Sequence, residues 1–254
     1  MLATRVIPCL LLKGAGLVKT IRFKDPKYVG DPINAVRIFN DKEVDELIFL
    51  DITASREGKG PAFSTIEDIT SECFMPVAYG GGITTVEEVS RIVSMGVEKI
   101  VLNTSALRRP GLVTEISERI GASSTVVAID VKKDLLGRYR VYEAARQAGT
   151  SVSPVDHARR MVAAGAGEIL VNDVNRDGTG AGFDLALVRD VASAVEVPVI
   201  ACGGAGTLAD LRQASDAGAS AVAAGSLFVY MGKHRAVMIN YPPQTALKEL
   251  FRHD

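Results

Sequence analysis

Short apolar runs alternate with longer amphipathic stretches along this chain, and no other feature limits its possible folds as strongly. The runs are mostly continuous in apolar residues, as parallel strands buried on both faces are. Eight of them share 254 residues, about 32 residues per unit. They are Val6–Leu10, Glu46–Ile52, Pro76–Tyr79, Lys99–Asn103, Thr125–Asp130, Glu168–Asp173, Pro198–Cys202 and Ala221–Ala224. The pattern predicts an α/β fold, a (β/α)8 TIM barrel.

Four of the intervening stretches have the spacing of amphipathic helices, namely Pro32–Val44, Thr85–Met95, Pro154–Ala164 and Leu185–Val195. Pro8 in the first run departs from the pattern, because proline cannot donate to a strand ladder. We retain that strand because the other runs fit the same period.

Segments of the first half of the chain recur in the second half in the same order. The matched pairs are Glu46–Asp51 with Glu168–Asp173, Gly80–Gly82 with Gly203–Gly206, and Asn103–Leu107 with Ala224–Leu227; Thr125–Asp130 also matches the first strand. Each offset lies between about 119 and 123 residues, roughly half the chain. We therefore expect one domain, 1–254, built from two half-barrel repeats at roughly 1–122 and 123–254.

The composition excludes several classes of function. The 29 Lys and Arg residues nearly balance 30 Asp and Glu, and a net charge of −1 gives no electrostatic footprint for nucleic acid or an anionic membrane. The chain shows no signal peptide and no apolar run as long as a membrane span, so we expect a cytoplasmic protein. Cys9, Cys73 and Cys202 form no CxxC pair and have no clustered histidines, so we expect no disulfide framework, metal or other cofactor.

Glycine clusters follow the third and seventh runs, at the strand ends where loops build the active site of such a barrel. Glycine permits positive φ and lets backbone N–H groups approach an anion. In each half a small polar turn follows the next strand, and such turns present donors to phosphate oxygens. We predict two phosphate cradles, one with Gly81, Gly82, Asn103 and Thr104, the other with Gly204, Gly206, Gly225 and Ser226. The alternative, loops that only pack strands against helices, would suit a single glycine run better than two symmetric copies.

Acidic residues occur at strand ends on the same face: Asp51, Asp130, Asp173 and, in the loop after the last of these, Asp177. A carboxylate at the end of an apolar strand is costly to bury without a task, so these are candidates for acid–base chemistry or ligand contacts. Helix capping is an alternative for each, and loop structure explains Asp177 equally well. Asp130 is the strongest candidate because the four residues before it are apolar. Its counterpart in the first repeat is Leu11, which leaves one central carboxylate.

A different set of charges stands at the opposite ends of the strands: Arg5, Glu46, Lys99 and Glu168. If these side chains point inward, they form a mutually neutralising ring, since unpaired burial would be very costly. The charges alone leave open whether such a ring is a plug against water or a gate.

These features resemble the HisF family, the cyclase subunit of imidazole glycerol phosphate synthase in histidine biosynthesis. The matching segments are Arg5–Leu10, Leu50–Ser55, Gly80–Ile83, Asn103–Thr104, Val127–Asp130, Gly165–Ile169, Arg176–Thr179 and Gly203–Gly206. The resemblance implies a HisH-like glutaminase docked on the amino-terminal face of the barrel, with ammonia passing a gate made of the four charges above. It also implies a phosphorylated small-molecule ligand contacted by both cradles and by Lys19, Asp51, Asp177 and Gly178.

The family's cyclase uses two aspartates as general acid and base, and only Asp130 matches one of them. Leu11 stands at the other position, and leucine cannot transfer a proton. Loss of a general acid or base typically costs about 10²–10⁴-fold in rate. Efficient cyclase activity is therefore not expected.

Further segments resemble a paralogous branch of the family that acts in acetamidino modification of bacterial surface-polysaccharide sugars: Phe23–Ala35, Gly225–Tyr230 running to Lys233, Arg235–Val237 and Ile239–Pro242. In that branch the barrel works with a glutaminase and an adenylating amidotransferase-like protein. We expect an ammonia-channelling subunit for an O-antigen-type sugar of lipopolysaccharide. The alternatives are an authentic cyclase that uses Asp130 with a substitute acid, and a non-catalytic scaffold that activates the glutaminase.

Overall fold

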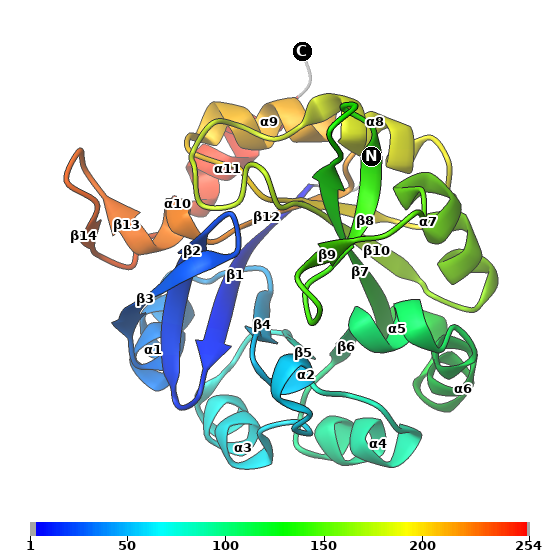
Figure 1. The fold of residues 1–254 in the computed structure, drawn as a ribbon. Helices are drawn as coiled ribbons and strands as arrows, with labels where there is room; N and C mark the ends of the chain where they lie inside the picture. The colour runs from blue at the N-terminus through cyan, green and yellow to red at the C-terminus, as the bar shows by residue number, and fades with distance from the viewer. Residues whose placement is uncertain (1–3, 253–254) are drawn as a thin grey trace.

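The computed structural model describes residues 4–252, and parallel strands form a closed barrel at its centre (Figure 1). The barrel strands in chain order are β1 (Arg5–Lys13), β4 (Leu47–Asp51), β5 (Val77–Gly80), β6 (Lys99–Leu102), β7 (Thr125–Lys133), β10 (Glu168–Asp173), β11 (Val199–Cys202) and β12 (Ala221–Ala224). Each pairs in parallel with the next, and β12 pairs with β1, which closes the ring. The predicted (β/α)8 barrel is confirmed.

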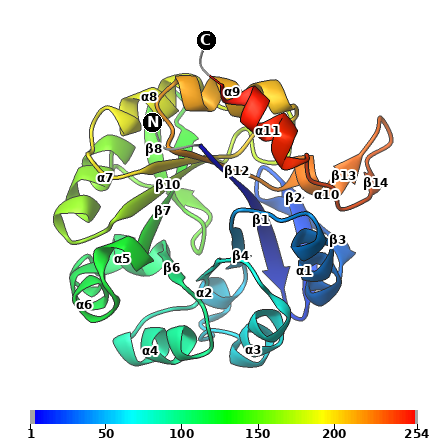
Figure 2. The same ribbon diagram turned by 180° about the vertical axis from the view of Figure 1, so that it is seen from behind.

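Helices surround the barrel on its outside (Figure 2). The longer ones are α1 (Pro32–Asp41), α3 (Phe63–Glu72), α4 (Val86–Ser94), α6 (Gly111–Ile120), α7 (Pro154–Ala163), α8 (Leu185–Ala192), α9 (Leu208–Asp216) and α11 (Gln244–Leu250). Short helical turns are α2 (Ala54–Glu57), α5 (Thr104–Arg108), η1 (Ala122–Ser124) and α10 (Ser226–Val229). No helix in the described part of the chain has the length and apolar character of a membrane span.

The predicted helices are present, but they end earlier than the apolar spacing suggests. The stretch Pro32–Val44 forms a helix only to Asp41, because Glu43 has a φ of 51° that no right-handed helix accepts. At their amino ends, side chains fix the boundaries: Asp31 caps α1, and Thr85 forms a capping box with Glu88 at α4.

Alternation along the strands divides the core into two layers. Outward residues of β1 such as Val6 and Leu10 pack against the helices, whereas inward residues such as Ile7 and Cys9 belong to a separate apolar cluster inside the barrel. Pro8 remains within β1, opposite Ala224 of β12. The barrel interior is therefore a packed apolar column between the two ends of the strands.

The first barrel strand of each half continues beyond its expected end into an antiparallel extension. β1 pairs with β2 (Gly16–Ile21), which pairs with β3 (Lys24–Gly30); β7 pairs with β8 (Tyr139–Glu143), which pairs with β9 (Ala148–Gly149). The predicted strand ends at Leu10 and Asp130 were therefore too early, since Leu11, Leu12 and Val131 still pair with neighbouring barrel strands and both strands then continue into the rim hairpins. The paired extensions favour two half-barrel repeats, a division that stays a prediction.

Candidate functional site

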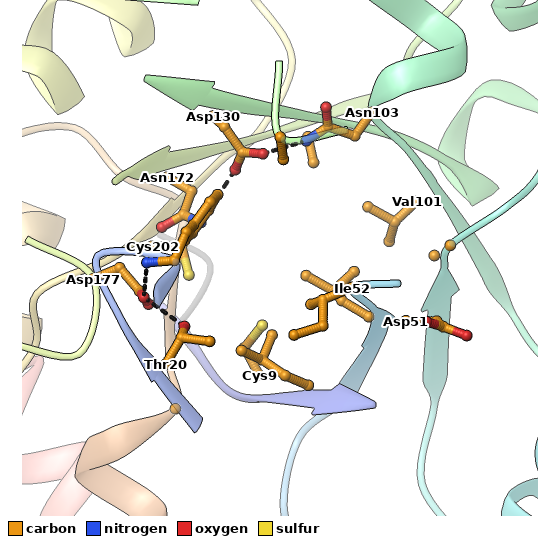
Figure 3. Close-up of a pocket in the computed structure, with 18 of the residues that line it drawn as sticks. Cys9, Thr20, Asp51, Ile52, Val101, Asn103, Asp130, Asn172, Asp177 and Cys202 are labelled. Carbon is orange, nitrogen blue, oxygen red and sulfur yellow. Dashed lines mark hydrogen bonds between the residues drawn. The ribbon is translucent and has the colours of Figure 1, made fainter. Parts of the chain in front are cut away.

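A cavity opens at the carboxyl ends of the barrel strands, and every barrel strand contributes to its lining (Figure 3). Most of the predicted ligand-binding residues meet there: Lys19, Asp51, Gly81, Gly82, Asn103, Thr104, Asp130, Asp177, Gly178, Gly204, Gly225 and Ser226. Gly206 lies outside the lining and packs against Gly180. A Cβ added to Gly206 would come within 2.4 Å of the carbonyl oxygen of Gly180. Asp173 is also absent from the lining, because alternation on β10 turns its carboxylate away to accept from the Asn175 amide.

Asp130 is the central acidic group of the cavity. Its Oδ2 accepts from Asn103 Nδ2 at 2.8 Å and its Oδ1 from Asn172 Nδ2 at 3.2 Å, as Figure 3 shows. Burial raises the pKa of Asp130 to about 7, although the two amide hydrogen bonds oppose the shift. A carboxyl group titrating there can donate or accept a proton under neutral conditions.

Asn172 was not among the predicted site residues, although a signal for it existed. It lies in β10 with the same parity as Glu168 and Leu170, so alternation places all three inside the barrel. Its Oδ1 is buried without a hydrogen-bond partner in the described structure and packs against Gly203, where a Cβ would come within 2.6 Å.

The wall opposite Asp130 is apolar. Leu11 of β1 stands opposite Leu50 of β4 in the sheet register, just as Asp130 stands opposite Asn172. Both leucines line the cavity together with Cys9. Where the second half of the barrel provides an acid and an amide, the first half thus provides two leucines.

The first predicted cradle is a tight turn that requires glycine. Gly81 and Gly82 have φ values of 134° and 71°, and Cβ atoms there would lie 2.6 Å from Asp51 Cβ and 2.5 Å from Lys59 O. Asp51 Oδ1 accepts from Thr53 and from the Ala54 amide, so this carboxylate caps the turn that starts α2. Asp51 therefore fixes the loop in addition to lining the cavity.

The second predicted cradle surrounds a buried lysine. Lys19 of β2 is only 7% exposed, and its Nζ donates to Cys9 O at 2.9 Å. A Cβ on Gly225 would lie 1.8 Å from this Nζ, so glycine is needed to admit the ammonium group beside Ser226. Among the described residues no carboxylate pairs with Lys19.

Asp177 connects the loop after β10 to the extension of β1. Its Oδ2 accepts from Thr20 Oγ1 at 2.8 Å and from the Phe23 amide at 3.3 Å. Gly178, with a φ of 69°, packs so closely that a Cβ would lie 2.1 Å from Thr20 O. Both residues thereby position β2 and its lysine over the cavity.

At the opposite ends of the strands, the four charges form the expected ring. Arg5 pairs with Glu46 at 2.5 Å and with Glu168, and Lys99 Nζ pairs with the same two carboxylates at 3.1 and 3.0 Å. The carboxylates are almost fully buried, whereas the Arg5 and Lys99 side chains are 30% and 19% exposed. The ring closes the amino-terminal face of the barrel, and its role as an ammonia gate stays a prediction.

The strands have a cavity at their carboxyl ends and, at their amino ends, a ring of two positive and two negative side chains. These features define a (β/α)8-barrel protein with the organisation of an enzyme. Residues 5–235 match the family model described as "Histidine biosynthesis protein". The chain belongs to this family, and specifically to its HisF members, cyclase/lyase-type subunits that work with glutamine-derived ammonia.

The curated relatives extend over nearly the whole chain. A Pseudomonas aeruginosa protein provisionally named imidazole glycerol phosphate synthase subunit hisF2 is 54% identical over 243 residues, 95% of this chain and 97% of the relative. A Vibrio vulnificus protein provisionally named hisF3 is 46% identical over 254 residues, 98% and 96% of the two chains. The imidazole glycerol phosphate synthase subunit HisF of Alkaliphilus metalliredigens is 41% identical over 231 residues, 91% and 92% of the two chains. The resemblance to HisF is confirmed, and the acetamidino branch stays a prediction.

Proposed function

We propose that this barrel channels ammonia from a HisH-like glutaminase for acetamidino modification of an O-antigen-type surface-polysaccharide sugar. The observation that carries the proposal is the contrast between the ends of the barrel. The ring of Arg5, Glu46, Lys99 and Glu168 is complete, whereas the cavity has Leu11 and Leu50 opposite its one central carboxyl group. Ammonia handling needs the charged ring, which is present. Ring-closing chemistry with two carboxylates needs a second carboxylate opposite Asp130, and leucines stand there instead.

The interior between the two ends suits an uncharged molecule. The inward cluster contains Ile7, Ala78, Val126, Ala221 and Ala223 among other apolar side chains. A neutral ammonia molecule enters such surroundings at far lower cost than an ammonium ion would. The glutaminase would dock on the amino-terminal face, where the charged ring meets solvent.

The remaining components of the proposal follow from the paralogous branch. An adenylating amidotransferase-like protein would consume the ammonia by replacing the oxygen of an activated N-acetyl group with nitrogen. The barrel itself would use no cofactor and act in the cytoplasm. The glycine cradles and Asp130 would hold a phosphorylated small molecule at the mouth.

Asp130 also supports an alternative, an authentic imidazole glycerol phosphate cyclase of histidine biosynthesis. Its pKa of about 7 fits proton transfer, and a second acid from elsewhere in the cavity would have to replace the missing aspartate.

The two functions are separated by supplying the purified chain with the phosphoribulosyl substrate of the cyclase and an ammonium salt, beside a Leu11→Asp variant. We expect the wild type to turn over poorly and L11D to gain about 10²-fold or more, because the second acid–base group is restored. Leu11→Asn is the matched control, polar and of similar size but unable to exchange a proton, and it should stay near the wild-type rate. Robust wild-type turnover would refute the proposal.

A further inference from the structure

A small hairpin follows α10 and stands out from the barrel beside β3 (Figure 1). Its strands are β13 (Tyr230–Met231) and β14 (Ala236–Val237), and the turn between them begins at Gly232. The hairpin is anchored at its base, because the Met238 amide donates to Val229 O and the Asn240 amide to Phe228 O, both at 2.9 Å. The base of the hairpin is therefore fixed to α10, whose first residue is Ser226.

Arg235 on this turn reaches back toward the mouth. Its Nη1 donates to Gly178 O at 3.1 Å, and its Nη2 lies 3.5 Å from Ser226 Oγ. The guanidinium carbon stands 4.6 Å from the centre of the Tyr230 ring, and a φ of 51° at Arg235 completes the turn. No carboxylate of the described residues forms an ion pair with it.

Two cations without acidic partners thus flank the same short segment. Lys19 meets Gly225 from the interior of the cavity, and Arg235 meets Ser226 from the rim. Burying an ammonium group without a counter-ion is costly, so the site favours a ligand that brings negative charge. A carbonyl and a hydroxyl are neutral partners for a guanidinium, and phosphate oxygens would form stronger, charge-assisted bonds with it.

We propose that Arg235 is an anion-binding residue of the second cradle, and that with Lys19 and Ser226 it holds the phosphate monoester end of the ligand. On binding, the guanidinium exchanges its bond to Gly178 O for two phosphate oxygens while it stays over Tyr230. Two positive charges match a phosphate dianion, and the planar fork of arginine suits bidentate contact. The inference rests on the phosphate cradles of the proposed function and is independent of the fate of the ammonia.

The test is binding of inorganic phosphate to the full chain, measured by isothermal titration at about 0.15 M ionic strength to suppress non-specific attraction. We expect Arg235→Ala to weaken binding about tenfold or more, because a charge-assisted hydrogen bond is lost. Arg235→Lys should recover part of the affinity. The matched control is Lys233→Ala, which removes one positive charge from the exposed part of the same turn and should change the affinity less than about twofold.

Double variants assign the effect to one cradle. Ser226→Ala should be non-additive with R235A, since both residues contact one ligand group, whereas Thr104→Ala in the first cradle should be additive. Equal effects of R235A and K233A, or additivity of R235A with S226A, would overturn the anion-binding role of Arg235 and leave the cradles in place. Absence of saturable phosphate binding in the wild type would overturn it together with the cradles. The ammonia-channelling function is judged separately by the L11D assay.

Discussion

At the scale of single residues, the mouth of the barrel is asymmetric in a way that controls its chemistry. Asp130 is buried and accepts hydrogen bonds from the amides of Asn103 and Asn172. The hydrogen bonds stabilise its charged form, but burial destabilises that form more and raises the pKa. At the equivalent place in the other half, Leu11 and Leu50 offer no polar group. The cavity thus has one titrating carboxyl group at its centre and an apolar wall facing it.

The raised pKa of Asp130 makes folding stability depend on pH. The folded pKa of about 7 exceeds the ordinary value of 3.8, so the protonated form favours the folded state. This contribution is complete below the ordinary pKa and is lost as the pH rises to about 7. Asp130→Asn, which stays neutral, should therefore gain about 2–4 kcal/mol in unfolding free energy relative to wild type between about pH 4 and about pH 8.

Urea unfolding of both proteins at the two pH values measures this difference. The introduced amide is compatible with the site, because Asn172 Oδ1 is without a partner and can accept after a flip of the side chain. Asp68→Asn on the exposed face of α3 is the control for simple loss of charge. A D130N-minus-wild-type difference that does not change with pH would contradict the raised pKa.

At the scale of elements, the extension β2–β3 carries the lysine of the second predicted cradle. Lys19 lies on β2, and β2 is tied to the loop after β10 by Thr20 and Asp177. The Arg22 amide adds a backbone hydrogen bond to Asp177 O at 2.9 Å. The extension therefore carries Lys19, a predicted binding residue, on a strand held by its pairing with β1 and by these contacts to the loop after β10.

Thr20→Val should loosen this extension. The substitution removes the hydroxyl that donates to the Asp177 carboxylate and keeps the shape of the side chain. We expect the free energy of unfolding to fall by about 1–3 kcal/mol. Amide hydrogen exchange should accelerate in β2 and β3, and phosphate affinity should fall because Lys19 is no longer held. Thr114→Val on the exposed side of α6 is the matched control and should leave exchange in the extension unchanged. Unaltered protection of β2 in T20V would show that the hydrogen bond from Thr20 to Asp177 does not anchor it.

At the scale of the whole molecule, the charged ring joins strands that are far apart in the sequence. Arg5 comes from β1, Glu46 precedes β4, Lys99 starts β6 and Glu168 starts β10, so the ring bridges both halves of the barrel. Each carboxylate is shared by two cations, and removal of one cation leaves buried negative charge in excess. The same arrangement would control what passes between the amino-terminal face and the mouth.

Lys99→Ala should separate glutamine hydrolysis from ammonia delivery in the complex with the glutaminase. With glutamine labelled by ¹⁵N at the side-chain amide and unlabelled ammonium in solution, the wild-type complex should transfer mainly the label into product. The K99A complex should hydrolyse glutamine but incorporate mostly unlabelled nitrogen, because ammonia escapes before the mouth. Lys248→Ala, on the exposed side of α11, should behave as wild type. Undiminished label transfer in K99A would contradict a gating role for Lys99.

Much of the fold could be predicted because its determinants are local. Continuous apolar runs identify buried parallel strands, and the spacing of Val89 and Ile92 in α4 identifies a helix face. The rim extensions β2–β3 and β8–β9 could not be predicted in this way. β3 and β9 are mostly exposed, and the buried parts of β2 and β8 include charged residues such as Lys19 and Glu143, so no continuous apolar run marks these strands.

The sequence by itself determined the barrel, the four charges at its amino-terminal face and the single aspartate opposite Leu11, since periodicity and residue type are carried by the chain. Only the tertiary structure decided which polar groups meet. Asn172 reaches Asp130, Lys19 reaches Gly225, and Arg235 reaches Gly178 because strand register and rim loops bring distant segments together. The pKa of Asp130 belongs to the same category, because desolvation depends on every strand that surrounds the carboxyl group and on none alone.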